Sequence, residues 1–260
     1  MARRVVKTDP LLGPLTCDRI TADYRVWQRA RGHRFSVDDV ATALTAFAAA
    51  PGASRILDLG CGLGSVLLVL AWKCPHATLV GIEAQAMSYE LARRNVALNS
   101  LEARVTVHHG DLRYDSVLDA AGTGFDLVTG TPPYFAPDAA LQAEDEQRAF
   151  ARIEYRGGVE AYVAAAARAV APGGRIVLCG SASAPERVEN AARAHGLAVL
   201  AQCDLRPREG HACLFSIWTL AEEPATADGA RSEIVLRDAA GERTEDARRL
   251  TELCGLSVVS

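Results

Sequence analysis

The chain has 260 residues, of which 49% are apolar and 23% are charged, and its formal net charge at pH 7 is −4. This length fits one large domain with enough apolar residues for a sizeable core. The small negative charge excludes a general binder of polyanions, and no apolar run approaches the roughly 20 residues that a membrane-spanning helix needs.

Charge is distributed unevenly along the chain. Residues 1–34 hold eight basic and three acidic side chains, a net charge of +5, so the remaining residues carry −9. A basic segment on an acidic body can form a local phosphate-binding face. The same composition is also typical of a solvated, partly disordered terminus, and both interpretations stay open.

The cysteines indicate the cellular compartment. There are seven of them, and none forms a CxxC pair. An odd number of thiols without metal-type spacing predicts reduced cysteines in a cytoplasmic protein, with neither disulfides nor a zinc site.

His108 and His109 are adjacent at a strand end and would point to opposite faces, so no metal site is expected there. The first residues carry charges without an apolar run, so we expect no signal peptide.

Short apolar strands alternate with helices from residue 55 onward. The predicted strands cover residues 55–60, 77–83, 103–109, 125–130, 175–180, 197–205 and 212–220, and the predicted helices cover residues 63–74, 86–99, 158–171 and 184–196. This alternation predicts an α/β fold with a doubly wound, mostly parallel sheet and helices on both faces. The last two strands follow each other without a helix, so one of them is expected to be antiparallel. Gly196 is placed to end its helix.

The pattern divides the chain into three parts. Residues 1–34 are the basic N-terminal segment, residues 35–220 are the main domain, and residues 221–260 are an extension expected to pack on the same domain. The extension begins as a loop and continues as a strand, a turn and a helix that starts at Thr244.

A glycine-rich turn follows the first strand of the main domain. Asp58 precedes Gly60, Gly62 and Gly64. In doubly wound sheets, ligands bind at the carboxyl ends of the strands, and glycines there let a ligand approach the backbone. The dinucleotide fingerprint would need glycine at position 65, where this chain has Ser65. A carboxylate before the glycines suits an ammonium group, such as that of S-adenosyl-L-methionine, better than a pyrophosphate.

Two further carboxylates follow the next two strands. Glu83 can accept two hydrogen bonds from ribose hydroxyls. Asp111 can accept a hydrogen bond from an adenine amino group, with Leu112 flanking the ring. Taken singly, Glu83 also fits an NAD enzyme, and Asp111 also fits a loop or helix cap. Three carboxylates at the ends of successive strands together indicate a nucleoside-containing cofactor.

Four motifs in this order resemble the class I S-adenosylmethionine-dependent methyltransferases: DLGCGLG (58–64), GIE (81–83), HGDL (109–112) and TPPYF (131–135). Within that class, the chain is most similar to the bacterial tRNA1(Val) adenine-37 N6-methyltransferase group of small methyltransferases. The likeness also includes residues 31–47 and the C-terminal strand and helix.

The resemblance implies a seven-stranded sheet whose last strand is antiparallel, and S-adenosyl-L-methionine as the cofactor. It also implies the role of each motif residue. Asp58, Gly60, Gly62 and Gly64 would hold the methionine end, Glu83 the ribose, and Asp111 with Leu112 the adenine.

The resemblance further implies that residues 131–135 act on the methyl acceptor. In this family the residue before Pro-Pro-Tyr is Asn, Asp or Ser, and it accepts a hydrogen bond from the amine. The carbonyl of the first proline, here Pro132, accepts the second, and Pro133 helps to fix the direction of the carbonyls. Tyr134 would stack on the base, and Phe135 would extend the aromatic surface. Thr131 departs from the pattern, because its hydroxyl can accept a hydrogen bond but is shorter than an Asn side chain and stiff.

Three interpretations of this departure stay open. The protein methylates adenine N6 in tRNA, or it methylates another acceptor, such as a side-chain amide, another base or a small molecule, or it binds the cofactor or RNA without transfer. The basic N-terminus favours RNA, and both a monomer and a homodimer are compatible with the sequence. Arg152 and Arg156 fit phosphate contacts or ordinary surface charges, and the sequence favours the second. Phe35 and Asp38 are expected, from the resemblance, to close over the cofactor.

Overall fold

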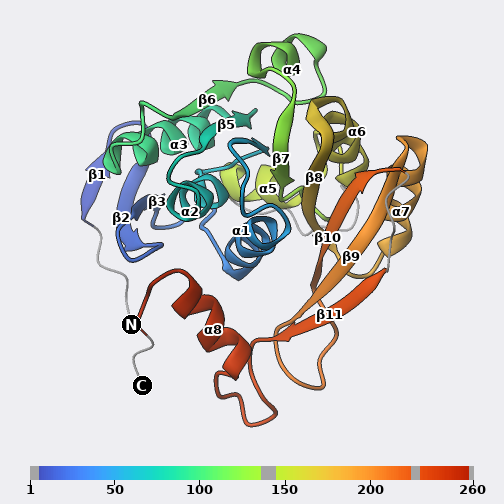
Figure 1. Cartoon of the computed structure of the whole chain (residues 1–260). Helices are drawn as coiled ribbons and strands as arrows, with labels where there is room; N and C mark the ends of the chain where they lie inside the picture. Colours follow the sequence, from blue (N-terminus) through green and yellow to red (C-terminus); the bar gives the residue numbers. More distant parts are fainter. Residues whose placement is uncertain (1–5, 136–144, 224–228, 258–260) are drawn as a thin grey trace.

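The computed structural model describes residues 6–135, 145–223 and 229–257 (Figure 1). The strands are β1 (Lys7–Asp9), β2 (Gly13–Arg19), β3 (Arg25–Arg29), β4 (Arg55–Leu59), β5 (Thr78–Glu83), β6 (Val105–His109), β7 (Phe125–Gly130), β8 (Val170–Ser181), β9 (Leu197–Arg206), β10 (Phe215–Glu222) and β11 (Ala230–Val235). The helices are α1 (Val37–Ala49), α2 (Ser65–Lys73), α3 (Ala86–Leu98), α4 (Asp115–Ala121), α5 (Glu146–Arg152), α6 (Val159–Ala169), α7 (Pro185–Ala194) and α8 (Glu245–Leu253).

The main sheet has the order β11-β9-β10-β8-β7-β4-β5-β6. Its pairs from β8 to β6 are parallel, whereas β10 runs antiparallel to both β8 and β9. This confirms the mostly parallel sheet and the antiparallel strand expected near its end. The predicted count of seven strands is one too low, because the C-terminal extension adds β11 parallel to β9 at the sheet edge.

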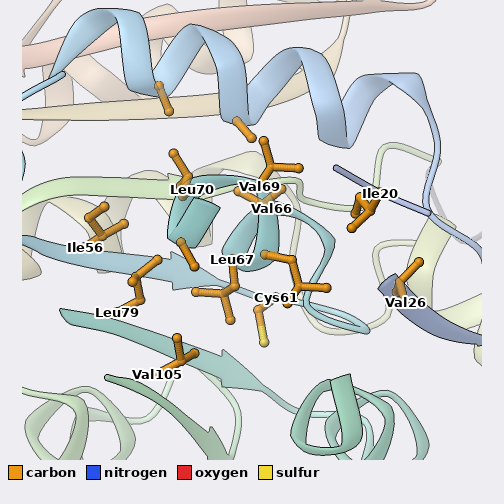
Figure 2. Packing of buried hydrophobic residues seen from close by; sticks show 14 of the residues in the cluster. Ile20, Val26, Ile56, Cys61, Val66, Leu67, Val69, Leu70, Leu79 and Val105 are labelled. Carbon is orange, nitrogen blue, oxygen red and sulfur yellow. The ribbon is translucent and has the colours of Figure 1, made fainter. Parts of the chain in front are cut away.

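Two groups of helices cover the two faces of this sheet. Helices α1, α2 and α3 contribute to one buried apolar cluster, and α4, α6 and α7 contribute to the other. Figure 2 shows Val66, Leu67 and Leu70 of α2 in the same cluster as Ile56 and Leu79 of neighbouring strands. Burial of both sheet faces explains why the parallel strands are continuous apolar runs rather than alternating ones.

The N-terminal segment forms a separate antiparallel sheet, β1-β2-β3, which lies beside α3 (blue in Figure 1). Leu15 and Val26 of this sheet are buried in the first apolar cluster. Asn95 of α3 accepts a hydrogen bond from Trp27 N at 2.6 Å and donates to Trp27 O at 3.0 Å. The interpretation of this segment as disordered is therefore wrong for the described residues, because its apolar side chains are buried against α3.

Local sequence signals explain several element boundaries. The Thr244 hydroxyl accepts a hydrogen bond from Ala247 N at 3.2 Å, which confirms the predicted start of α8. Gly196 has φ +66° just beyond α7, which confirms its helix-ending role. Helices α1, α4 and α5 were not among the predicted elements. No helix in the described ranges combines the length and apolarity needed to cross a bilayer.

The strand order reverses between β4 and β7. From β4 the chain proceeds to β5 and β6 on one side, and then returns to β7 on the other side of β4. The carboxyl ends of β4 and β7 thus diverge at a topological switch point, where doubly wound sheets bind their ligands. The glycine-rich turn follows β4, and the Thr-Pro-Pro-Tyr turn follows β7.

Candidate active site

A cleft lies at this switch point, and most of the predicted site residues line it. Its lining includes Gly60, Gly62, Glu83, Asp111, Leu112, Thr131 and Pro133. Asp58 and Gly64 are not part of the lining. The fold thus brings the turns after β4, β5, β6 and β7 together around one space.

The glycine-rich turn has a backbone shape that only glycine adopts readily. Gly60, Gly62 and Gly64 all have positive φ, at +61°, +57° and +89°. A Cβ atom on Gly60 would lie 2.1 Å from the Tyr162 hydroxyl oxygen, so a larger residue fits only if Tyr162 moves. The buried Tyr162 of α6 thereby supports the loop from behind while also lining the cleft.

Glu83 fixes the position of this loop. One carboxylate oxygen accepts from Gly62 N at 2.8 Å, and the other accepts from Gln85 N at 2.6 Å. No cation pairs with Glu83 among the described residues. Burial raises the pKa of Glu83, although these two backbone hydrogen bonds oppose the shift. The lone pairs left on its oxygens can accept hydrogen bonds from a ligand's hydroxyl groups.

Asp111 is held in its ionised form at the same cleft. Its carboxylate accepts from Arg113 Nη2 at 2.7 Å and from Arg113 N at 3.0 Å. Partial burial acts to raise the pKa of Asp111, but these hydrogen bonds outweigh it and the pKa lies below its usual value. The neighbouring Leu112 is buried and presents an apolar surface to the cleft.

Asp58 lies away from the cleft surface and is 1% exposed. Thr129 donates a hydrogen bond to its Oδ1 at 2.9 Å, whereas Oδ2 has no hydrogen-bond partner in the described part of the chain. Burial raises the pKa of Asp58 to about 7, and the Thr129 hydrogen bond only partly opposes this. The carboxyl predicted for the methionine end is thus a buried group that does not line the cleft, and one of its oxygens has no hydrogen-bond partner in the described part of the chain.

Thr131 joins the cleft to a second cavity. It lines both spaces, and the second cavity, of about 270 Å³, is also lined by Pro132 and Tyr134. No hydrogen bond is made by the Thr131 hydroxyl within the described residues. The hydroxyl is therefore available to a group that enters either space.

The turn after Thr131 is anchored through its backbone. Tyr134 N and Phe135 N both donate to the carbonyl oxygen of Arg152, at 3.1 and 2.9 Å. The Tyr134 ring packs edge-on against Phe215, with ring centroids 4.8 Å apart. Phe135 is 42% exposed and lines neither space, so it is placed outside the second cavity.

The sequence analysis did not single out His33, which belongs to the site. His33 lines both spaces, and burial lowers its pKa to about 4 despite the opposing charge of Asp38. It comes from a segment whose only sequence signal is mixed polarity, and only the fold brings it to the switch point. Arg156, for which the sequence favoured an ordinary surface charge, instead lines the cleft and lies 4.6 Å from the centroid of the Phe150 ring.

Three residues for which the sequence led to a prediction lie elsewhere than predicted. Phe35 and Asp38 line the second cavity and not the cleft. Arg152 also lines the second cavity, so it is not an ordinary surface charge remote from the site. Within the described ranges, no group of three or more His, Cys, Asp or Glu side chains is arranged to hold a metal ion.

Comparison with known proteins agrees with this geometry. The family described as Methyltransferase small domain matches residues 33–188. The tRNA1(Val) (adenine(37)-N6)-methyltransferases of two Porphyromonas gingivalis strains are 35% and 28% identical over 47% and 75% of this chain. The alignments span 48% and 77% of those two relatives, so the chain matches only about half of the first.

A relative with another acceptor also matches. The ribosomal protein uL3 glutamine methyltransferase of Bradyrhizobium diazoefficiens is 32% identical over 41% of this chain and 32% of its own length. Among solved structures, a predicted O-methyltransferase from Agrobacterium tumefaciens has a TM-score of 0.61 and 18% identity. That alignment covers 86% of this chain and 99% of the other, and at this identity the match concerns the fold alone.

Proposed function

Because this chain belongs to the family of small methyltransferase domains, we propose that it moves the methyl group of S-adenosyl-L-methionine to an amino nitrogen, and that this nitrogen is N6 of an adenine in tRNA. One observation carries the proposal. Thr131, followed by Pro132, Pro133 and Tyr134, lies where the cofactor cleft meets the second cavity. A donor in the first space and an acceptor in the second would meet at this turn.

The cleft fits the proposed cofactor. Gly62 lines the cleft at a position where a Cβ atom would meet nothing within 4 Å, and Glu83 is a buried carboxylate without a cation among the described residues. In our proposal, Glu83 holds the ribose hydroxyls and Asp111 holds the adenine amino group beside Leu112. When bound, S-adenosyl-L-methionine supplies a methyl group on a sulfonium that a nitrogen lone pair can attack.

The protein's part in the reaction is to position the acceptor and to accept its protons. The lone pair of an exocyclic amine is delocalised, so the nitrogen is a poor nucleophile until it becomes pyramidal. The Thr131 hydroxyl and the Pro132 carbonyl would accept hydrogen bonds from the two amine protons. These bonds stabilise the positive charge that develops on nitrogen during transfer.

Tyr134 supplies the surface for the acceptor base. Its backbone is tied to Arg152, and its ring is fixed by the edge contact with Phe215. A base that stacks on a fixed aromatic ring gains about 1–3 kcal/mol in single-stranded nucleic acid. In this role Tyr134 would hold the base while Thr131 holds its amino group.

A second candidate acceptor is a glutamine side-chain amide. Its nitrogen is also delocalised and would use the same two hydrogen-bond acceptors. The sequence similarity to a uL3 glutamine methyltransferase supports this alternative. A third possibility is cofactor or RNA binding without methyl transfer.

The decisive experiment uses purified protein, methyl-labelled S-adenosyl-L-methionine and three acceptor pools from a host that lacks the gene. These pools are total tRNA, total protein and the small-molecule extract. RNase-sensitive label in tRNA that disappears with Tyr134→Ala supports the proposal, and nucleoside analysis then identifies the base. Label only in protein or small molecules overturns the tRNA assignment. No label in any pool, with cofactor binding intact, supports the non-catalytic alternative.

A further inference from the structure

Helix α5 forms one wall of the second cavity. Arg148 and Arg152 of this helix both line the cavity, together with Thr131 and Tyr134. Because they are four residues apart on a helix, the two arginines lie on the same face. The base-stacking ring and two cations therefore surround one space.

Neither arginine is neutralised by the part of the chain that the structure describes. Their guanidinium groups make no ion pair with any described residue, and both arginines are exposed. Two other arginines near the site do make ion pairs: Arg29 pairs with Asp145 at 2.8 Å, and Arg34 pairs with Asp18 at 2.8 Å. Asp38 and Asp39 of α1 also line this cavity, but neither makes an ion pair with Arg148 or Arg152 among the described residues. Two arginines without such a pair at one cavity suit an anionic group brought in by the acceptor.

The position of α5 is fixed by its opposite side. Gln147 is fully buried, donates to Ser88 Oγ at 3.2 Å, and accepts from His33 N at 3.2 Å. Asp145 caps the helix by accepting from Arg148 N at 3.0 Å. Anchored in this way, α5 presents its two exposed arginines from a defined place rather than from a free loop.

We propose that Arg148 and Arg152 bind backbone phosphates next to the nucleotide whose base enters the second cavity. This inference rests on the proposed function and narrows its acceptor class to a polynucleotide. An arginine guanidinium matches the geometry of phosphate oxygens and stays charged at any physiological pH. A glutamine amide carries no anion and would leave these two cations without a partner. His33 cannot replace them, because its lowered pKa of about 4 leaves it neutral at pH 7.

The test compares Arg148→Gln/Arg152→Gln with wild type in steady-state methylation of tRNA. We expect KM for tRNA to rise about 10- to 100-fold, with kcat within about twofold and cofactor affinity unchanged. The slope of log KM against log salt should fall by about 0.7 for each phosphate contact removed. Arg148→Lys/Arg152→Lys keeps the charge and should retain most of that slope.

Arg249→Gln is the matched control, because Arg249 is an exposed arginine of α8 without a side-chain hydrogen bond or ion pair among the described residues. It should leave both KM and the salt slope unchanged. If the double glutamine variant behaves like Arg249→Gln on tRNA that wild type methylates, the phosphate inference is wrong while the proposed function stands.

A second measurement separates failure of the inference from failure of the proposed function. Adenosine 5′-monophosphate and adenosine are compared as ligands of the cofactor-loaded protein by calorimetry, which needs no turnover. We expect the monophosphate to bind about tenfold more tightly to wild type, and this advantage to vanish in the double glutamine variant. Equal binding of the two ligands to wild type would overturn the inference, whatever acceptor pool is labelled.

Discussion

At the scale of a single residue, the proposed chemistry depends most on Thr131. Its hydroxyl lies at the junction of the two spaces without a partner in the described residues, and Thr131→Val removes the hydroxyl while keeping the shape. If the hydroxyl accepts an amine proton, loss of this acceptor costs about 3 kcal/mol, or roughly 100-fold in rate. Single-turnover methylation should show this fall with unchanged cofactor affinity.

Thr106→Val is the control for that substitution, because Thr106 is an exposed threonine on β6 away from the turn.

Thr131→Asn tests whether the site is adapted to threonine. A rise in adenine methylation would mean that Thr131 is a weakened form of the family's acceptor. A fall would mean that the pocket is fitted to threonine and to the natural acceptor.

Substitution of Gly60 tests whether the glycine-rich turn has room for a side chain beside Tyr162. Gly60→Ala places a Cβ atom 2.1 Å from the Tyr162 hydroxyl oxygen and also forces alanine to φ +61°. Gly196→Ala shares the left-handed backbone, at φ +66°, but meets no atom within 4 Å. Both variants should lose about 1 kcal/mol from backbone conformation. Only Gly60→Ala should lose more in urea unfolding and also lose calorimetric cofactor binding; equal losses would contradict this packing argument.

Asp58 links stability to pH. Burial raises the pKa of Asp58 to about 7, above the usual value of 3.8, so the folded state holds a proton that the unfolded state releases. The free energy of unfolding contributed by this group therefore falls as pH rises from about 4 to about 7. Asp58→Asn should remove that loss and raise the free energy of unfolding at pH 8 by up to about 4 kcal/mol, measured by urea unfolding without cofactor.

Asp126 provides the opposite case on the same sheet. Hydrogen bonds from Ser54 lower the pKa of Asp126, so its contribution is present above the unfolded-state pKa and is lost as pH falls. Asp126→Asn should therefore destabilise at pH 8, where Asp58→Asn stabilises. The same sign for both variants would contradict the assigned protonation states.

At the scale of an element, the proposed acceptor cavity depends on helix α5, which forms one of its walls. Seven residues cannot form a stable helix alone, so α5 is held by its cap and by the buried Gln147. Gln147→Ala leaves buried hydrogen-bonding groups of its neighbours without a partner and should reduce stability by about 1–3 kcal/mol. Hydrogen exchange should report faster opening of α5, and KM for the acceptor should rise.

Glu146→Gln serves as the control on the same helix, because the Glu146 side chain is exposed and makes no ion pair in the described ranges. It should leave exchange in α5 nearly unchanged. Equal exchange in both variants would mean that Gln147 does not hold the helix.

At the scale of the whole molecule, the N-terminal sheet is connected to the cofactor loop. Asn95 is fully buried, bonds both backbone groups of Trp27, and also donates to Leu63 O at 2.8 Å, next to the glycine turn. Asn95→Ala should lower the free energy of unfolding by about 2–3 kcal/mol and weaken cofactor binding. Asn190→Ala, an exposed site on α7, should change neither quantity in urea unfolding or calorimetry.

The fold of the main domain could be predicted because its signals are local. Alternating apolar strands and helices, glycines after β4 and carboxylates after successive strands each depend on a few neighbouring residues. Parallel strands bring their carboxyl ends to one edge, so the sequence alone predicts that Glu83, Asp111 and Thr131 lie together.

The sequence by itself therefore determined the sheet class, the cofactor type and the turn that we propose faces the acceptor. Only the tertiary structure decided that β11 joins the sheet, that residues 7–29 form a second sheet, and that α5 places Arg148 and Arg152 beside Tyr134. The physical reason is the range of the interactions. Turn geometry and periodicity act between near neighbours, whereas the wall of the second cavity is built by burial and hydrogen bonds between segments more than 50 residues apart.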